Sequence, residues 1–180
     1  MKLNAQELRT TLVDLEVAKS IKKNPITIIL DNVLDTYNIG SIFRLADAIA
    51  AKKVYLCGST ETPPNTRIKK ASINTWQWVD WEYTPDTATL ITTLKSLTPK
   101  LSIVAVEQDE KSIPFQHAAY RFPIAIIVGN ETNGISKEAL NLADTIVELP
   151  MFGINTSLNV MVSTGIILYD ILRQLPSIGD

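Results

Sequence analysis

Apolar stretches typical of strands alternate with amphipathic stretches typical of helices along most of this chain. Residues 124–128 are apolar without a break, the pattern of a strand that a parallel sheet buries on both faces. Ile42, Ala46 and Ile49 follow one another at spacings of four and three residues, which predicts a helix between two strands. This alternation favours an α/β fold with a mainly parallel sheet flanked by helices. The other predicted strands are 26–30, 54–57, 101–106 and 145–149, and the other predicted helices are 4–23, 87–97, 136–142 and 157–175.

The chain is expected to form one domain after a short N-terminal extension. Its 180 residues, 46% of them hydrophobic, suffice for one sizeable core. No internal repeat is present, and no linker rich in Gly, Pro or Ser divides the chain. Asn4 is the expected cap of the first helix, and Ser136 of the helix that it opens. The sequence therefore predicts a helical extension over residues 1–24 and a single domain over residues 25–180.

Cysteine and histidine are too few for several common kinds of site. Cys57 and His117 are the single residues of their types, which excludes an intrachain disulfide and the usual zinc sites with three or four Cys or His ligands. No dense carboxylate cluster suggests another metal. The longest apolar run is far too short to span a bilayer, and the start MKLNAQELR lacks the apolar core of a signal peptide. We therefore expect a soluble, cytoplasmic protein without a metal.

Charge is distributed unevenly along the chain. The 17 Lys and Arg residues and 19 Asp and Glu residues give a net charge of −2, which neither suggests nor excludes a polyanionic partner. Residues 1–80 carry 11 basic and 8 acidic side chains, whereas residues 81–180 carry 6 and 11. The basic clusters are either solvated surface or a local phosphate-binding patch. They consist of Lys19, Lys22, Lys23, Lys52, Lys53, Arg67, Lys69 and Lys70.

The loop after the first predicted strand combines asparagines, a glycine and an arginine. Parallel α/β sheets place their ligand sites at the carboxyl ends of strands, where this loop lies. Asn38 is expected to cap the following helix, and Gly40 permits another backbone to approach closely. Arg44 lies off the apolar stripe that Ile42, Ala46 and Ile49 form on the predicted helix. It either reaches an anion at the helix N-terminus or pairs with Asp35 or Asp47.

The loop over residues 129–136 follows the buried strand and opens a helix. It resembles a phosphate-binding loop in outline, but Ile135 stands where the essential lysine would be. The G-x-G-x-x-G fingerprint of dinucleotide-binding proteins is also absent from the chain. Glu131 belongs either to a capped turn or to a binding site. A nucleoside triphosphate and a nicotinamide cofactor are therefore disfavoured.

A third unusual segment runs over residues 149–160. Polar Ser157 and Asn159 alternate there with apolar Leu158 and Val160 at the start of a predicted helix, a mixture that packing alone does not explain. No G-x-S-x-G motif exists, and His117 lies in an ordinary context elsewhere. A hydrolase triad around Ser157 is therefore disfavoured.

Together, the three segments resemble the SpoU, or TrmH, family of RNA 2′-O-ribose methyltransferases within the SPOUT superfamily. The first motif is N-x5-N-x-G-x3-R over residues 32–44, and the second is IVGNE over 127–131 with Gly134. The third is LPM over 149–151 with Gly153, followed by SLNV over 157–160. Three motifs in this order are far more specific than any one of them. The resemblance covers residues 25–175.

The resemblance implies a single α/β domain whose C-terminal stretch forms a deep trefoil knot, a rare exception to the rule that chains do not thread. It also implies a homodimer, with the terminal helix in the interface, and S-adenosylmethionine as the methyl donor. An adenine and a sulfonium need apolar walls and backbone hydrogen bonds. The implied cofactor-binding residues are Val128, Gly129, Asn130, Leu149, Met151, Ser157 and Leu158.

The same resemblance implies that Arg44 is essential for catalysis. A guanidinium with a pKa of about 12.5 to 13.8 stays charged, which disfavours a role as a free-standing base. We expect Arg44 to hold the neighbouring RNA phosphate and to stabilise developing alkoxide charge while positioning supplies much of the acceleration. The other implied catalytic residues are Asn38, Glu131, Ser157 and Asn159.

The implied substrate is a ribose 2′-hydroxyl of RNA. The short N-terminal extension is similar to that of tRNA-modifying members, so tRNA is favoured over the alternative, rRNA. Relatives commonly continue the third motif with small residues, whereas this chain has Met161, Ser163 and Thr164, which affects cofactor and dimer packing. Two other hypotheses remain: a base methyltransferase of another SPOUT branch, disfavoured by SLN at 157–159, and a non-catalytic RNA-binding module.

Overall fold

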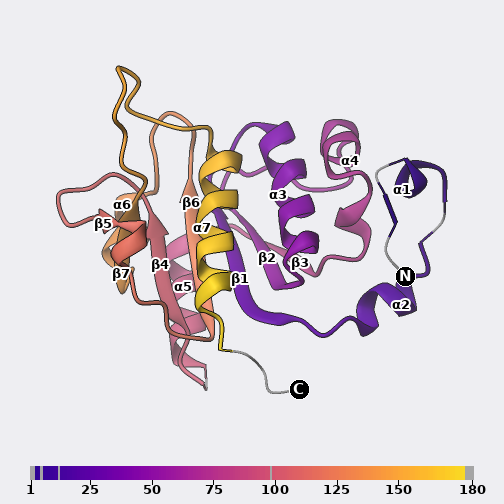
Figure 1. The fold of residues 1–180 in the computed structure, drawn as a ribbon, viewed down its shortest axis with the longest axis horizontal. Helices are drawn as coiled ribbons and strands as arrows, with labels where there is room; N and C mark the ends of the chain where they lie inside the picture. Colours follow the sequence, from indigo (N-terminus) through magenta and orange to yellow (C-terminus); the bar gives the residue numbers. More distant parts are fainter. Residues whose placement is uncertain (1–2, 5, 12, 98, 177–180) are drawn as a thin grey trace.

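The centre of the protein is a sheet of seven strands, all paired in parallel (Figure 1). We describe a computed structural model, which covers residues 3–4, 6–11, 13–97 and 99–176. The strands are β1 (Asn24–Asp31), β2 (Ala51–Cys57), β3 (Trp81–Thr84), β4 (Ser102–Val106), β5 (Ile113–Pro114), β6 (Ile124–Gly129) and β7 (Thr145–Glu148). Their order is β3-β2-β1-β6-β4-β7-β5, so β6 lies between β1 and β4.

Helices cover both faces of this sheet. The α-helices are α1 (Glu7–Thr10), α2 (Leu15–Ser20), α3 (Thr36–Ala48), α4 (Thr66–Ser72), α5 (Thr87–Ser96), α6 (Lys137–Asn141) and α7 (Val160–Gln174), and the 3₁₀ turns are η1 (Thr75–Gln77) and η2 (Phe115–His117). Side chains of α3, α4 and α7 pack on one face, and those of α5 and α6 on the other. The predicted α/β fold with a parallel sheet flanked by helices is confirmed.

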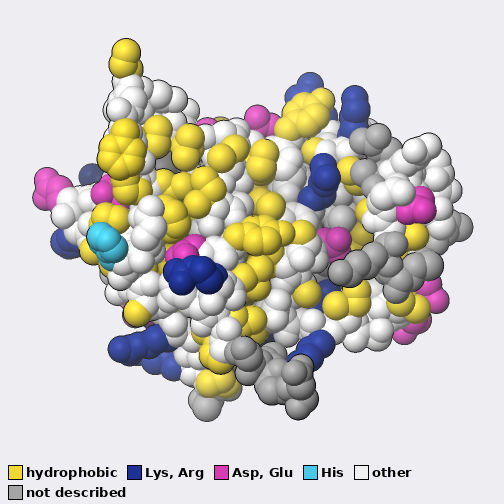
Figure 2. Space-filling view, in the orientation of Figure 1, with side chains coloured by type: hydrophobic (Ala, Val, Ile, Leu, Met, Phe, Trp, Pro, Cys, Tyr) yellow, Lys and Arg dark blue, Asp and Glu magenta, His cyan; other side chains and the backbone are white. Residues whose placement is uncertain are grey.

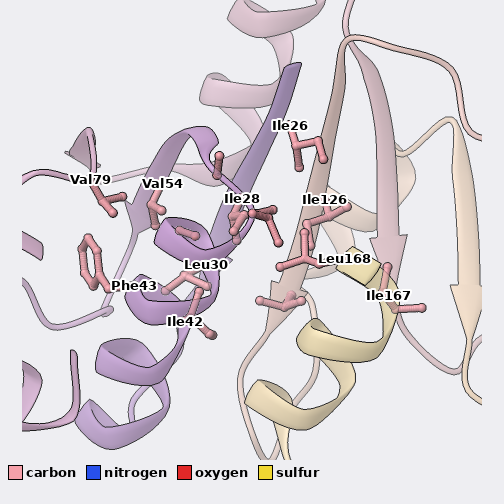
Figure 3. Close-up of a cluster of buried hydrophobic side chains, with 14 of the residues drawn as sticks. Ile26, Ile28, Leu30, Ile42, Phe43, Val54, Val79, Ile126, Ile167 and Leu168 are labelled. Atoms are coloured by element: carbon pink, nitrogen blue, oxygen red, sulfur yellow. The ribbon is translucent and has the colours of Figure 1, made fainter. Parts of the chain in front are cut away.

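Alternate residues of β1 and β6 build the two halves of the core. Ile26, Ile28 and Leu30 point from β1 towards α3 and α7, where Phe43 and Leu168 meet them (Figure 3). Ile29, which lies between Ile28 and Leu30 in β1, joins the cluster on the opposite face of the sheet. Each fully buried aliphatic side chain stabilises the fold by roughly 1.5 to 3 kcal/mol relative to exposure. The strands at the centre of the sheet are therefore apolar on both faces.

The prediction of one helix over residues 4–23 is wrong. Residues 7–10 and 15–20 form two short helices, because Thr11 is extended and Asp14 starts a new helix. The Asp14 carboxylate accepts hydrogen bonds from the backbone N–H groups of Glu16 and Val17. The Asn4 side chain does accept from two N–H groups at the start of α1. Leu12, which the predicted helix would include, lies outside the described residues.

Several elements lack a strong sequence pattern. The sequence did not predict α4, β3 or the two-residue β5, since β3 is half polar and β5 is too short to show a period. The terminal helix begins at Val160 and not at residue 157. The boundary between an extension over residues 1–24 and a domain from residue 25, and the trefoil knot, stay predictions.

No helix in the described part of the chain combines the length and the apolar character needed to cross a bilayer.

Candidate functional site

The carboxyl ends of β1, β4, β6 and β7 meet at one edge of the sheet, at the top of Figure 1. The first motif runs from the loop after β1 into α3, and the second runs from the end of β6 into the loop that follows it. The segment between β7 and α7 contains the third, and it projects beyond this edge. The three motifs therefore converge where a parallel sheet places its ligand sites.

A chain of hydrogen bonds joins the three motifs. One oxygen of the Glu131 carboxylate accepts from the backbone N–H of Asp35 at 3.1 Å and from Asn38 Nδ2 at 3.0 Å. The other oxygen accepts from the backbone N–H of Leu34 at 3.1 Å. Asn38 Oδ1 in turn accepts from Asn159 Nδ2 at 3.0 Å. Asn38, Glu131 and Asn159, which the sequence predicts to belong to one site, are thus joined through the side chain of Asn38.

The prediction that Asn38 caps its helix is wrong. The cap of α3 is Asp35, whose carboxylate accepts from the backbone N–H of Tyr37. Asn38 lies inside the helix, buried, with its amide between Glu131 and Asn159. The capping role in this network falls to Asn159, whose Oδ1 accepts from two N–H groups at the start of α7. The amide of Asn38 therefore couples the starts of two helices.

The hydrogen bonds to Glu131 also set its protonation. Burial raises the pKa of this carboxyl, but the hydrogen bonds from Asn38 and from the backbone of Leu34 and Asp35 together outweigh burial and lower the pKa below its usual value. Glu131 is therefore ionised at neutral pH. Its negative charge stays fixed beside the N-terminus of α3, where the helix dipole favours it.

Two adjoining cavities open beside this network. The larger has a volume of about 560 Å³ and the smaller about 140 Å³, and Glu107, Ser157 and Leu158 line both. All seven residues that the sequence predicts to bind a cofactor face one cavity or the other. Val128, Gly129 and Asn130 line the larger cavity, Leu149 and Met151 line the smaller one, and Ser157 and Leu158 line both.

The second loop closes on itself at Gly129. A Cβ at this position would collide with the backbone of Gly134 and Ile135, so only glycine allows the close approach. Asn130 holds the turn together: its Oδ1 accepts from the N–H groups of Thr132 and Asn133, and its Nδ2 donates to the backbone oxygen of Asn32. The Asn130 side chain thus joins the second loop to the first.

Arg44 lies apart from the hydrogen-bonded network. It is exposed on α3 and forms no ion pair among the described residues. The alternative that it pairs with Asp35 or Asp47 is not observed, since Asp35 caps α3 and Asp47 accepts from Trp78 Nε1. Arg44 is six residues from Asn38, so the two side chains leave the helix in different directions.

The structure adds two carboxylates that the sequence did not single out. Asp31, fully buried at the end of β1, accepts from Thr87 Oγ1 and from the backbone N–H of Ser136. Ser136 occupies the cap position before α6 as predicted, but its side chain forms no capping hydrogen bond. Glu107, directly after β4, accepts from the N–H of Ile135 at 2.8 Å. Their position at the ends of apolar strands was the signal in the sequence.

The site offers neither a reactive thiol nor a metal centre in the described residues. Burial raises the pKa of the Cys57 thiol to about 12, so it stays protonated. No three His, Cys, Asp or Glu side chains come together there as metal ligands. The polar side chains that line the two cavities are amides, hydroxyls and carboxylates.

Comparison with known proteins agrees with the motifs. The model of the SpoU rRNA Methylase family matches residues 25–169. A tRNA (guanosine(18)-2′-O)-methyltransferase of Aquifex aeolicus is 31% identical over 159 residues, 85% of this chain and 71% of the relative. The 23S rRNA (guanosine-2′-O-)-methyltransferase RlmB of Ralstonia nicotianae is 30% identical over 88% of this chain and 63% of its own length.

A solved structure shows the same fold. The AdoMet-bound rRNA methyltransferase of Sinorhizobium meliloti has a TM-score of 0.79 at 26% identity, over 89% of this chain and 61% of that chain. The family match covers most of the chain, and the resemblance read from the three motifs is confirmed. This chain belongs to the SpoU rRNA methylase family.

Proposed function

We propose that this protein transfers a methyl group from S-adenosylmethionine to the 2′-hydroxyl of a ribose in RNA, with tRNA as the preferred substrate. The observation that carries the proposal is the junction of Asn38, Glu131 and Asn159 beside two cavities that all seven expected cofactor-binding residues line. The names of the relatives support RNA 2′-O-methylation. The Aquifex relative supports tRNA and the Ralstonia relative supports rRNA.

The residues around the two cavities fit the methyl donor. Their combined size lies within the roughly 300 to 1,000 Å³ of small-molecule sites. Val128, Leu149 and Leu158 provide apolar walls, while the carboxylates of Glu107 and Glu148 offer negative charge to a cationic ligand. When bound, S-adenosylmethionine supplies an activated methyl group on a sulfonium. The backbones of Val128, Gly129 and Leu149 and the side chains of Met151 and Leu158 would hold it.

The hydrogen-bonded network prepares the site and does not itself exchange protons. Glu131 accepts hydrogen bonds from the two residues just before α3 and from the Asn38 side chain in its first turn. Asn38 also accepts a hydrogen bond from Asn159 at the start of α7, which extends this constraint to the third motif. Ser157 is exposed and lines both cavities, which suits it to contact the ribose. A ribose hydroxyl is a poor nucleophile, so fixing its direction of attack is the main contribution of these residues.

Arg44 supplies positive charge to the RNA. Its guanidinium is exposed and suited to bidentate contact with a phosphate. Arg67, Lys69 and Lys70 are exposed on α4, which packs so closely on α3 that a Cβ at Gly40 would collide with its backbone. This basic surface would bind the RNA backbone while Arg44 stabilises developing charge on the ribose oxygen.

We also propose a homodimer formed through α7. Val162, Ile166 and Tyr169 lie at spacings of four and three residues and form an exposed apolar stripe on this helix. Phe152 is 97% exposed in the neighbouring loop. Figure 2 shows hydrophobic side chains over α7 and at the tip of that loop. An apolar surface of this kind marks an association site, and a second copy of the chain is the proposed occupant.

We further propose that the protein is located in the cytoplasm.

Methylation of defined RNAs tests the function. Purified protein would be incubated with S-adenosylmethionine and either tRNA or ribosomal RNA from a strain that lacks the gene, and 2′-O-methylated riboses would be mapped. We expect a new methylated ribose in tRNA. Methylation in ribosomal RNA alone would assign the alternative substrate. Binding of RNA and cofactor without any methylation would contradict the enzymatic proposal and favour a non-catalytic RNA-binding module.

A further inference from the structure

The segment between β7 and α7 forms one wall of the cavities, yet little holds it in place. Residues 152–159 are all exposed, and a Cβ placed on Gly153 would have no neighbour within 4 Å. Among the described residues, the side chain of Gln108 makes the one hydrogen bond that ties residues 150–158 to another part of the chain. Gln108 Nε2 donates to the backbone oxygen of Thr156 at 2.6 Å.

The residue before Gln108 holds the opposite wall. Glu107 Oε2 accepts from the backbone N–H of Ile135 at 2.8 Å, and its Oε1 accepts from the N–H of Gln108 at 3.0 Å. Gly134 has a φ of +69° and no Cβ, which leaves room for this carboxylate against the loop. Glu107 therefore anchors the second loop through its end at Ile135.

The position of both residues suits them to set the distance between the walls. They follow β4, which pairs with β6 on one side and β7 on the other. The second loop leaves from β6 and the third segment from β7, so Glu107 and Gln108 stand between them at the end of a strand that is hydrogen-bonded on both edges. Glu107 lines both cavities, and Gln108 lines the smaller one.

We propose that Glu107 and Gln108 act as a clasp, a pair of positioning residues that holds the two loop walls at the separation that the methyl donor requires. This inference rests on the proposed function of the cavities. Preorganised walls reduce the ordering cost of binding, so the clasp contributes to cofactor affinity. It does not contact the reacting atoms, and turnover at saturating cofactor depends on it little.

Substitution of Gln108 in the whole chain tests the clasp. Gln108→Ala removes the donor, and Gln108→Glu keeps the shape but turns an oxygen towards the Thr156 carbonyl. A hydrogen bond of ordinary net strength predicts a Kd for S-adenosylhomocysteine raised roughly 3- to 10-fold, measured by calorimetry. The KM for S-adenosylmethionine should rise by a similar factor while kcat changes less than about twofold. Gln77→Ala, an exposed glutamine on η1, is the matched control.

A second measurement does not depend on ligand binding. Chymotrypsin cleaves after exposed aromatic residues, and Phe152 lies in the tethered segment. We expect faster cleavage after Phe152 in both Gln108 variants than in the parent and in Gln77→Ala. Unchanged cleavage together with unchanged Kd would overturn the clasp. A parent protein that binds no S-adenosylhomocysteine would instead contradict the proposed function, while faster cleavage in the variants would still show the tether.

Discussion

Arg44 carries the positive charge that we propose to act in methyl transfer. It lies exposed on α3, outside the hydrogen-bonded network of Asn38, Glu131 and Asn159. Replacing it with Ala should therefore leave the protein folded and the cofactor cavity intact. Loss of one group that stabilises transition-state charge typically costs about 10²- to 10³-fold in kcat.

We accordingly expect Arg44→Ala to lower methyl transfer by at least about 100-fold, with the Kd for S-adenosylhomocysteine unchanged within about twofold. Single-turnover transfer to RNA and calorimetry measure the two quantities. Arg121→Ala is the matched control, because Arg121 is exposed just before β6, at the opposite end of the sheet. Turnover of Arg44→Ala comparable to the parent would rule out the assigned role.

The contribution of Glu131 to folding stability should depend on pH. Burial raises its pKa, but the hydrogen bonds from Asn38, Leu34 and Asp35 lower it further than burial raises it. A carboxyl with a lowered folded pKa stabilises the protein above its unfolded value, near 4.5, and loses that contribution as the pH falls through the folded value. Glu131→Gln, which has no charge to lose, should be less stable than the parent at pH 7.

The difference in unfolding free energy between parent and Glu131→Gln should shrink as the pH falls below about 4.5. Chemical denaturation over a pH series measures it. Glu110→Gln, at an exposed carboxylate without a hydrogen-bond partner among the described residues, should match the parent throughout. A Glu131→Gln difference that stays constant from neutral to acid pH would contradict the lowered pKa.

At the same scale, the sequence indicated which residues belong to the candidate site better than it indicated their contacts. Asn38, Glu131 and Asn159 were found because each falls in a motif, but their direct contact depends on which way α3 and α7 face. The caps were harder: an Asn before an amphipathic stretch is a good cap, yet Asp35 stands three residues earlier and competes successfully. Glu107 belongs to no motif, and its place directly after an apolar strand is a signal too general to single it out without the fold.

Among elements, the second loop gives the sharpest prediction. A Cβ at Gly129 would meet the backbone of Gly134 and Ile135, which cannot move without opening the loop. Gly129→Ala should therefore lower thermal stability and weaken S-adenosylhomocysteine binding by at least about tenfold, since a strained core contact costs about 1 to 3 kcal/mol. Gly153→Ala meets nothing within 4 Å and should change stability little. Equal melting temperatures and Kd values for both variants would contradict this account of the loop.

Strands and helices were predictable in proportion to their burial. β1 and β6 are apolar on both faces because helices cover both sides, so their sequences stand out. β3 keeps two exposed residues and β5 has only two residues, so neither has a readable period. Helix ends depend on single side chains, and Asp14 and Asn159 moved two of them away from the predicted positions.

For the whole molecule, the exposed stripe on α7 predicts a dimer that one charge can break. Ile166→Glu would place a carboxylate in the centre of the stripe formed with Val162 and Tyr169. We expect light scattering to report twice the chain mass for the parent and a single chain for the variant. Asn141→Glu, on the exposed surface of α6, should stay dimeric. A monomeric parent protein would overturn the proposed assembly.

The place of β6 between β1 and β4 also determines when the sheet can be completed during synthesis. β1, β2 and β3 can pair with one another as soon as residues 24–84 have left the ribosome. The other edge of β1 has no partner until residues 124–129 follow. Throughout that interval the nascent chain carries an open edge on an apolar strand, a starting point for aggregation. The risk of aggregation through this edge therefore lasts until the C-terminal half, which contains β6, has been synthesised.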